Sequence, residues 1–208
     1  MTRPTSNAIS LGAATAALLL STLPAAAAPA SKTLDNLQAA YNGESNAGAR
    51  YLASAKVADT EGFGATASLF RAAARAEEVH AASHARVIRS LGVEPVAKIE
   101  TPAIANTREA LLAAIKGETY EKETMYPDFL VVARAEGQKD AIETFSLART
   151  AEAEHAKLYK ASLDGLGTGK SPAKTYYVCT VCGLTKTSVD FSKCPSCFQP
   201  KEKYVSVS

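Results

Sequence analysis

The sequence predicts a mainly α-helical protein, in which a four-helix bundle is followed by a small β-rich domain that binds metal through four cysteines. Three observations lead to this fold class. Residues 33–164 are rich in Ala, Leu and Glu and poor in Gly, which is the composition of helices. Glutamates recur on the apolar face of each expected helix. All four cysteines lie within residues 179–197.

Residues 1–30 are expected to form a secretory signal peptide and to lie outside the fold. Arg3 gives a positive start, residues 11–23 form an apolar core, and the Ala-Pro-Ala sequence at 28–30 fits cleavage before Ser31. Residues 25–27 offer a competing cleavage site. We therefore expect a periplasmic or secreted protein, or a cytoplasmic one if the signal is not used.

Glycines and prolines divide the next part of the chain, residues 31–164, into four expected helices. Their ranges are 33–58, 61–91, 106–136 and 138–164. Pro95 and Pro102 lie in a longer connection, so the bundle should have a long middle crossover. Pro127 should remove one hydrogen bond from the third helix and bend it.

The C-terminal part of the chain has a different composition. Residues 165–175 have the composition of a linker. Residues 176–208 contain short runs of β-type residues. A domain this small needs a cross-link, such as a bound metal ion or disulfides, because it cannot bury a large core.

Charge and hydropathy exclude two classes of partner. The net charge of +2 gives no strong electrostatic case for nucleic acid. No uninterrupted apolar run reaches the roughly 18–20 residues of a membrane span. The charge is uneven, with −3 on residues 31–164 and +4 on residues 165–208. We interpret the basic excess as an offset to a negative tetrathiolate metal centre.

The cysteines form two CxxC pairs, Cys179 with Cys182 and Cys194 with Cys197, separated by eleven residues. Two such turns can present four sulfurs to one ion tetrahedrally, and an all-sulfur site of this kind holds zinc or iron. The alternatives are two disulfides or free thiols, but a disulfide within a CxxC is usually a redox device. The pattern predicts a metal site without separating iron from zinc.

Acidic residues and histidines fall on the inner faces of the expected helices. On the third helix, for example, this face also carries Met125 and Val132. The inward set is Glu44, Glu77, Glu118, Glu121 and Glu152, with His80 and His155. Five buried carboxylates without cations would be very costly or would hold protons. Glu from two helices and Glu-x-x-His from the other two form the pattern of ferritin-like di-iron bundles.

The competing interpretation of the Glu-x-x-His pairs is surface i,i+3 pairing, which stabilises a helix only slightly. Glu78, Glu123 and Glu154 lie off the inner face and are expected in solvent. His84 follows His80 by one turn, and we favour a packed or hydrogen-bonded role over ligation.

With these motifs on four helices, the sequence resembles rubrerythrins over nearly all of the chain beyond residue 30. The segments that carry the resemblance are YNGESNA at 41–47 with Tyr51, EEVH at 77–80, GETYE at 117–121 followed by MYP at 125–127, and EAEH at 152–155. The cysteine module is similar to the rubredoxin-type domain of that family. The resemblance therefore implies a ferritin-like bundle with two irons and a rubredoxin-like domain with one iron or zinc.

The resemblance also implies roles for the metal ligands. Glu44 and Glu118 correspond to terminal ligands on different irons. Glu77 and Glu152 correspond to bridging carboxylates, and His155 to a permanent ligand.

Four further residues take roles from the resemblance. Glu121 and His80 correspond to a pair that exchanges on one iron during oxidation and reduction, and Glu121 is our candidate for the proton donor. Tyr51 and Tyr126 correspond to donors that orient ligating carboxylates. Two features depart from the family: the short gap between the CxxC pairs, with Leu184 where an aromatic residue is common, and the export signal.

The activity implied by the resemblance is reduction of hydrogen peroxide to water, in protection against oxidative stress. An unidentified donor would supply electrons through the rubredoxin-like iron, and in a homodimer each cysteine module would serve the bundle of the partner subunit, head to tail. One alternative is a ferroxidase or iron-storage protein, which would need a larger shell-like oligomer. The other is a non-enzymatic stress protein with zinc in the thiolate site.

Overall fold

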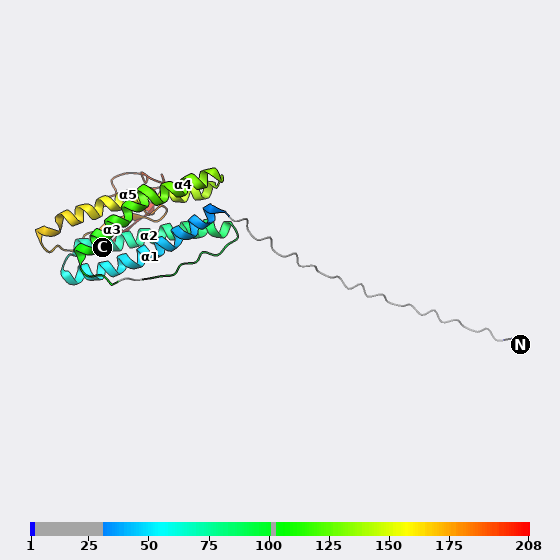
Figure 1. Ribbon diagram of the computed structural model, residues 1–208, viewed down its shortest axis with the longest axis horizontal. Coiled ribbons are helices and arrows are strands. Elements are labelled where there is room, and N and C mark those ends of the chain that lie inside the picture. Colours follow the sequence, from blue (N-terminus) through cyan, green and yellow to red (C-terminus); the bar gives the residue numbers. More distant parts are fainter. Residues whose placement is uncertain (3–30, 101–102) are drawn as a thin grey trace.

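The computed structural model describes residues 1–2, 31–100 and 103–208 (Figure 1). The predicted signal peptide and its cleavage site therefore lie outside the described residues, apart from its first two. The helices are α1 (Lys32–Glu61), α2 (Gly64–Ser90), α3 (Thr107–Tyr120), α4 (Tyr126–Ala135) and α5 (Lys139–Gly165). Among the described residues, no helix combines the length and the apolar character needed to cross a bilayer.

The helices α1 and α2 form a hairpin. Ser31 caps α1 by accepting a hydrogen bond from the backbone N–H of Leu34 at 3.4 Å. Gly62 ends α1 with φ of 84°, a left-handed conformation that glycine adopts without steric cost. The chain can therefore reverse within two residues and begin α2 at Gly64.

The connection between α2 and α3 runs back along the bundle beside α1 (Figure 1). Gln38 on α1 holds it by donating to the carbonyl of Glu94 at 2.9 Å. At the far end, the carboxylate of Glu61 accepts from the backbone N–H of Thr107 at 2.9 Å. Because α3 thus begins near the start of α2, the two helices run in the same direction, and the predicted long crossover is confirmed.

The third predicted helix, 106–136, is interrupted rather than only bent. A π-helical turn, η1 (Glu121–Met125), separates α3 from α4. The backbone N–H of Tyr126 reaches the carbonyl of Glu121, five residues back. Pro127, which has no N–H to donate, follows at once. Such turns insert one extra residue into a helix.

The inserted residue shifts the buried face of this helix. Before the turn, on α3, the predicted inward positions Leu111, Ala114 and Glu118 are buried. Beyond it, Tyr126, Leu130 and Ala133 are buried, whereas Met125 and Val132 are only half-buried. The predicted inner face beyond the turn was therefore wrong by one residue, because it assumed an uninterrupted helical period.

The C-terminal module is a small antiparallel sheet with the order β2-β1-β3. The strands are β1 (Tyr176–Cys179), β2 (Thr185–Lys186) and β3 (Tyr204–Val207), joined to the bundle through the short helix η2 (Leu166–Thr168). In the register, Val178 of β1 lies opposite Thr185 on one side and Val205 on the other. The short helix η3 (Lys201–Lys203) precedes β3.

The module lies against α2 and α5 of its own chain. Lys186 forms an ion pair with Glu154 of α5, with Nζ and Oε1 2.9 Å apart. Glu154 is half-buried, so its predicted exposure to solvent was wrong. The reason is that the module covers this outer face of α5, which the periodicity of the helix alone does not show.

The apolar core forms two layers with a polar centre between them. Tyr51, Phe70 and Tyr159 belong to one layer, where the rings of Phe70 and Tyr159 lie 5.1 Å apart. Tyr126 and Phe145 belong to the other, with their rings 5.8 Å apart. Four of the five predicted acidic residues, Glu44, Glu77, Glu118 and Glu152, lie between these layers, away from water.

Candidate metal centres

The four long stretches of helix bring their acidic residues together at one level of the bundle. Each contributing side chain is at most 2% exposed. The residues brought together are Glu44 from α1, Glu77 and His80 from α2, Glu118 from α3, and Glu152 and His155 from α5. Six of the seven donors predicted from the sequence therefore meet in the core.

These residues form two groups of possible metal ligands. In each group, one donor atom per residue lies within 4.8 Å of the others. The groups are Glu44, Glu77, His80 and Glu152, and Glu77, Glu118, Glu152 and His155. Glu77 and Glu152 belong to both groups, so the arrangement suits two adjacent ions bridged by two carboxylates.

The spacing within each group is that of donors around one ion. Nδ1 of His80 is 2.8 Å from Oε2 of Glu77 and 3.0 Å from Oε1 of Glu152. Nδ1 of His155 is 2.9 Å from Oε2 of Glu152 and 3.5 Å from Oε2 of Glu118. Nitrogen and oxygen ligands at about 2.1 Å from a metal lie about 3–3.4 Å from each other.

Buried polar atoms without hydrogen-bond partners support the same conclusion. They include Oε2 of Glu44, Oε1 of Glu77, Oε2 of Glu118, both carboxylate oxygens of Glu152, and Nδ1 of His155. Buried polar atoms in proteins normally have a partner, and here the atoms without one point into a shared space. Two metal ions would satisfy them, so the residues fit a di-iron centre.

The electrostatics of the buried glutamates also favour the binding of cations. Burial raises the pKa of Glu44 and of Glu118. Burial, together with Glu152 and Glu118, raises the pKa of Glu77 to about 8. Burial would also raise the pKa of Glu152, but His80 and His155 outweigh it and hold that pKa at about 2. Without metal the cluster therefore holds protons at neutral pH, and metal ions would displace them.

Tyr51 and Tyr126, which the resemblance made donors to ligating carboxylates, each form a hydrogen bond with a glutamate of the cluster. The hydroxyl of Tyr51 donates to Oε1 of Glu118 at 2.6 Å. The hydroxyl of Tyr126 donates to Oε1 of Glu44. Each pair joins a carboxylate to a tyrosine from a different helix, so both carboxylates are fixed before any metal binds.

His84 is hydrogen-bonded through both ring nitrogens and is not a candidate ligand. Burial, followed by the effect of His80, lowers its pKa to about 3, so the ring is neutral. Since the Tyr126 hydroxyl donates to Glu44, Nε2 of His84 donates to Tyr126 at 3.0 Å. Nδ1 then accepts from the hydroxyl of Thr144 at 3.0 Å. The favoured hydrogen-bonded role is confirmed.

Glu121 lies outside both groups. It is the first residue of the π-helical turn and is half-buried. Burial raises its pKa, as do Glu44 and Glu118, so it holds a proton near the cluster. His80 is the member of the predicted exchange pair that lies among the donors.

Sequence analysis missed the contacts that the module makes with the histidines. Nε2 of His80 is 3.1 Å from the carbonyl oxygen of Cys182, and Nε2 of His155 is 3.0 Å from Oγ1 of Thr185. Both partners come from the loop and strand around the first CxxC turn. No motif in the sequence indicates that these residues reach the bundle.

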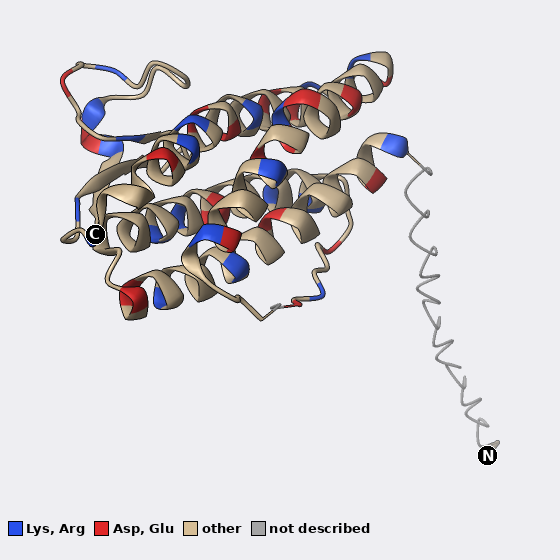
Figure 2. Ribbon diagram, turned by 60° about the vertical axis from the view of Figure 1, so that its left-hand side comes forward, with Lys and Arg blue, Asp and Glu red and all other residues tan. Residues whose placement is uncertain are grey.

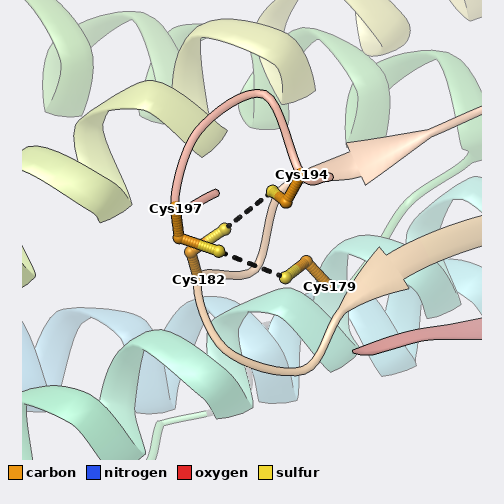
Figure 3. Close-up of side chains that lie close together, drawn as sticks. All are labelled: Cys179, Cys182, Cys194 and Cys197. Atoms are coloured by element: carbon orange, nitrogen blue, oxygen red, sulfur yellow. Dashed lines mark hydrogen bonds between the residues drawn. The ribbon is translucent and has the colours of Figure 1, made fainter. Parts of the chain in front are cut away.

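The four cysteines form the second centre (Figure 3). Sγ of Cys179 lies 3.7 Å from Sγ of Cys197, and Sγ of Cys182 lies 3.7 Å from Sγ of Cys194. A disulfide needs about 2.05 Å, whereas four sulfurs at about 2.3 Å from one ion are about 3.8 Å apart. All four cysteines are free, so the geometry fits a tetrathiolate metal site and excludes the predicted alternative of two disulfides.

The thiol acidities differ within this cluster. A hydrogen bond from Cys182 lowers the pKa of Cys179 to about 5. The same hydrogen bond, together with burial, raises the pKa of Cys182. Burial raises the pKa of Cys197 to about 11. Four thiolates therefore cannot coexist here unless a cation binds them.

Comparison with known proteins agrees with both centres. The rubrerythrin family profile matches residues 35–163. The chain is 34% identical to nigerythrin of Nitratidesulfovibrio vulgaris over 176 residues, which cover 84% of this chain and 86% of that protein. It is 35% identical to rubrerythrin-2 of Clostridium acetobutylicum, covering 83% of this chain and 95% of that one. The chain belongs to the rubrerythrin family.

A solved structure extends the similarity to three dimensions. The structure of nigerythrin in its fully reduced, all-ferrous state matches with a TM-score of 0.78 and 32% sequence identity, covering 91% of each chain. Together with the donor groups above, this likeness shows that the chain carries the ligand sets of a di-iron site and of a rubredoxin-like four-cysteine site.

The sequence-based expectation, that each rubredoxin-like module serves the bundle of a partner subunit, stays a prediction. In this single chain the module lies on its own bundle, through the contacts of His80 and His155. The homodimer itself stays a prediction.

Proposed function

We propose that the protein is a di-iron peroxidase that reduces hydrogen peroxide to water and protects against oxidative stress. The observation that carries the proposal is the pair of donor groups sharing Glu77 and Glu152. When bound, two irons in these groups would supply the two electrons that convert hydrogen peroxide and two protons into two molecules of water.

The proposed ligand roles follow the positions of the donors. Glu77 and Glu152, which belong to both groups, would bridge the ions. Glu44 and Glu118, each in one group, would be the terminal carboxylates. His155 would be the permanent histidine ligand.

The remaining pair gives the site its flexibility. His80 lies among the donors, and Glu121 lies one turn beyond Glu118, at the start of the π-helical turn. We propose that the two exchange as the charge of the site changes. Glu121 also holds a proton near the cluster, because burial and the acidic residues around it raise its pKa. It can therefore donate the proton that the departing oxygen needs.

A cavity between α1 and α2 supplies a route for a small substrate. Its volume is about 500 Å3, and its lining includes Glu44 and Glu77 as well as the small residues Gly48, Ala49 and Ala82. A Cβ added at Gly48 would lie 3.6 Å from the Cβ of Glu77. The small side chains therefore leave space between solvent and the cluster that suits peroxide better than a bulky substrate.

The electron route proposed for the site runs through the contact between Cys182 and His80. The carbonyl of Cys182 meets the ring of His80 at 3.1 Å, and that ring belongs to a donor group. Gly183 follows, with φ of 75°, and a Cβ there would collide with Nε2 of His80. A Gly183→Ala protein should displace the ring of His80 from this contact and pass electrons to the bundle at least about tenfold more slowly. The matched control is Gly137→Ala, since Gly137 also has a positive φ of 68° but its added Cβ would meet open space.

The test of the proposed function is anaerobic titration of the reduced, iron-loaded protein with hydrogen peroxide. We expect one peroxide to oxidise two irons of the bundle, with no oxygen gas released. Ala82→Leu should slow the reaction with tert-butyl hydroperoxide more than the reaction with hydrogen peroxide, and Ala113→Leu on α3 should change neither. Oxidation by dioxygen with no faster reaction with peroxide would contradict the peroxidase assignment.

Export and assembly are part of the same proposal. Cell fractionation with mass spectrometry of the N-terminus should find the mature chain outside the cytoplasm and starting near Ser31. Light scattering should give the mass of a homodimer. Full-length protein in the cytoplasm would contradict export, and a shell-sized particle would favour iron storage.

A further inference from the structure

The four-cysteine site has an inner and an outer side. Its inner side faces the bundle, where the carbonyl of Cys182 meets His80. Cys179, Cys182 and Cys194 are at most 2% exposed, whereas Cys197 is half-buried. The accessible edge of the site is therefore at Cys197, on the second CxxC turn.

An aromatic side chain projects beside this edge. Phe198 directly follows Cys197 and is 73% exposed. Its φ is 58°, a left-handed conformation that costs free energy for a residue with a bulky side chain. Its backbone N–H donates to the carbonyl of Cys194 at 2.9 Å, which closes the turn and fixes the position. Large apolar side chains are usually buried, and residues other than glycine usually avoid a positive φ. Phe198 departs from both tendencies, and such positions are typical of functional surfaces.

Three lysines lie on the loops around the cysteine site. Lys193 pairs through its backbone with Pro200, next to the turn, and the N–H of Lys201 donates to the carbonyl of Ser192 at 3.1 Å. The carbonyl of Lys203 accepts from the N–H of Thr180 at 2.9 Å, which places it beside the first CxxC turn. All three lysines are exposed.

The lysine charges are not neutralised. Within the described part of the chain, none of Lys193, Lys201 and Lys203 forms an ion pair with an acidic side chain. Figure 2 shows blue positions along the loops and the short helix of the module, with few red ones. Residues 165–208 carry a net charge of +4, so the outer side of the cysteine site is a cationic surface with an aromatic centre.

We propose that Phe198, Lys193, Lys201 and Lys203 form the docking surface for a small electron-transfer protein with an acidic face. Acidic groups on the partner would pair with the lysines and speed the encounter. The ring of Phe198 would lose its contact with water, as the aromatic anchors of interfaces do. Each encounter would pass one electron to the four-cysteine site from the partner, which is oxidised by one electron. This inference rests on the proposed function, since it names the kind of donor that the peroxidase would use.

Binding can be tested without redox chemistry. The probe is a small acidic [2Fe–2S] ferredoxin, and the protein is the full chain with zinc in the cysteine site. Calorimetry should detect binding that weakens at least about tenfold between low and physiological salt. Basic cytochrome c, the counter-probe, should not bind. Lys193→Glu, Lys201→Glu and Lys203→Glu together should abolish ferredoxin binding, whereas the charge-matched set Lys56→Glu, Lys116→Glu and Lys139→Glu on the bundle should not.

The aromatic residue has its own pair of variants. Phe198→Asn should weaken binding about tenfold, because Asn tolerates the left-handed conformation but lacks the ring. Val131→Asn on α4 is the control, since Val131 is 65% exposed and lies away from the module. Equal effects of the two lysine sets, or no effect of Phe198→Asn, would overturn the proposal. So would a change in oligomeric state with unchanged ferredoxin binding, which would make this surface a contact between copies of the chain.

The result is separable from the proposed function. Protein reduced chemically with dithionite does not need the docking surface, so the lysine and Phe198 variants should react with peroxide at the normal rate. If peroxide oxidation fails in the unmodified protein, the peroxidase assignment is wrong. If the unmodified protein reacts with peroxide but the lysine and Phe198 variants bind ferredoxin as well as it does, the proposed docking surface is wrong and the peroxidase assignment stands.

Discussion

The two metal sites of this chain are assembled in opposite ways. The bundle site collects its donors from α1, α2, α3 and α5 and hides them almost completely from solvent. The cysteine site takes all its donors from two turns of one short module, and one of them, Cys197, is half-buried rather than buried. The difference fits the proposed function, in which the bundle would shield the reaction with peroxide from solvent while the module would present an edge for electron entry.

Removal of a shared donor should separate the two sites most strongly. Glu152→Ala takes a carboxylate from both donor groups of the bundle and leaves His80 and His155 without one of their two common partners. We expect bundle iron to fall from about two per chain to near zero while about one iron stays with the cysteines. Metal analysis with visible absorption measures both. Glu143→Ala, on the exposed side of the same helix, is the control, and equal iron in the two variants would contradict the shared-ligand geometry.

The stability of the metal-free protein should fall as the pH rises. The pKa of Glu77 is raised from 4.5 to about 8, so this group favours the folded state below pH 4.5 and that stabilisation is lost as the pH approaches 8. His80 and His155 act in the same direction, because burial lowers their pKa values but the surrounding glutamates raise them further. Glu152, whose pKa is about 2, contributes stability throughout this window and loses it only under acid conditions.

Calorimetry between pH 5 and 8 checks this expectation. We expect the Tm of the metal-free protein to fall by roughly 5 °C or more over this range. The Tm of the iron-loaded protein should not follow it, because metal binding strengthens as the ligands lose protons. Glu77→Gln should make the decline smaller, while the other buried groups with raised pKa values keep part of it. A metal-free Tm that rises with pH would show that the acidic cluster is not buried as described.

The two tyrosine–carboxylate pairs should not be equivalent. Tyr126→Phe removes the donor to Glu44 and also the acceptor used by His84, whereas Tyr51→Phe removes only the donor to Glu118. We expect metal affinity to fall about tenfold or more for Tyr126→Phe and by a smaller factor for Tyr51→Phe. Competition with a calibrated chelator measures both. Equal losses would mean that the hydrogen bond to His84 does not position Tyr126.

The smallest effect is expected at the seam between module and bundle. Lys186→Met removes the ion pair with Glu154, which is partly exposed, and should lower stability by no more than about 1 kcal/mol. Lys160→Met, which removes a solvent-exposed ion pair with Asp164, should lower stability by a smaller amount. Thermal unfolding compares the two. A larger loss for Lys160→Met would indicate that the module is not held at Glu154.

The sequence predicted the cysteine site more fully than the bundle site, because the donors of the cysteine site lie close together in the chain and those of the bundle site come from four helices. The cysteine spacing is local, so it predicted the tetrathiolate cluster without any knowledge of the fold. The bundle site needed helical periodicity, which placed Glu44, Glu77, Glu118 and Glu152 correctly. It failed beyond Glu121, where one extra residue in a π-helical turn moves the inner face from Met125 to Tyr126.

The contacts between the two sites were beyond any sequence pattern. Thr185 and the carbonyl of Cys182 reach the histidines of the bundle because the module lies on α2 and α5. A threonine hydroxyl and a backbone carbonyl carry no sequence signature for such a role. The same holds for Glu154, whose exposure depends on where the module lies.

The most direct test of the central claim is anomalous diffraction at the iron edge from crystals of the iron-loaded protein. The account predicts two peaks in the bundle, one within bonding distance of Glu44 and His80 and the other within bonding distance of Glu118 and His155, with Glu77 and Glu152 between them. A third peak should lie among the four sulfurs. A single peak in the bundle, or none, would contradict a di-iron centre.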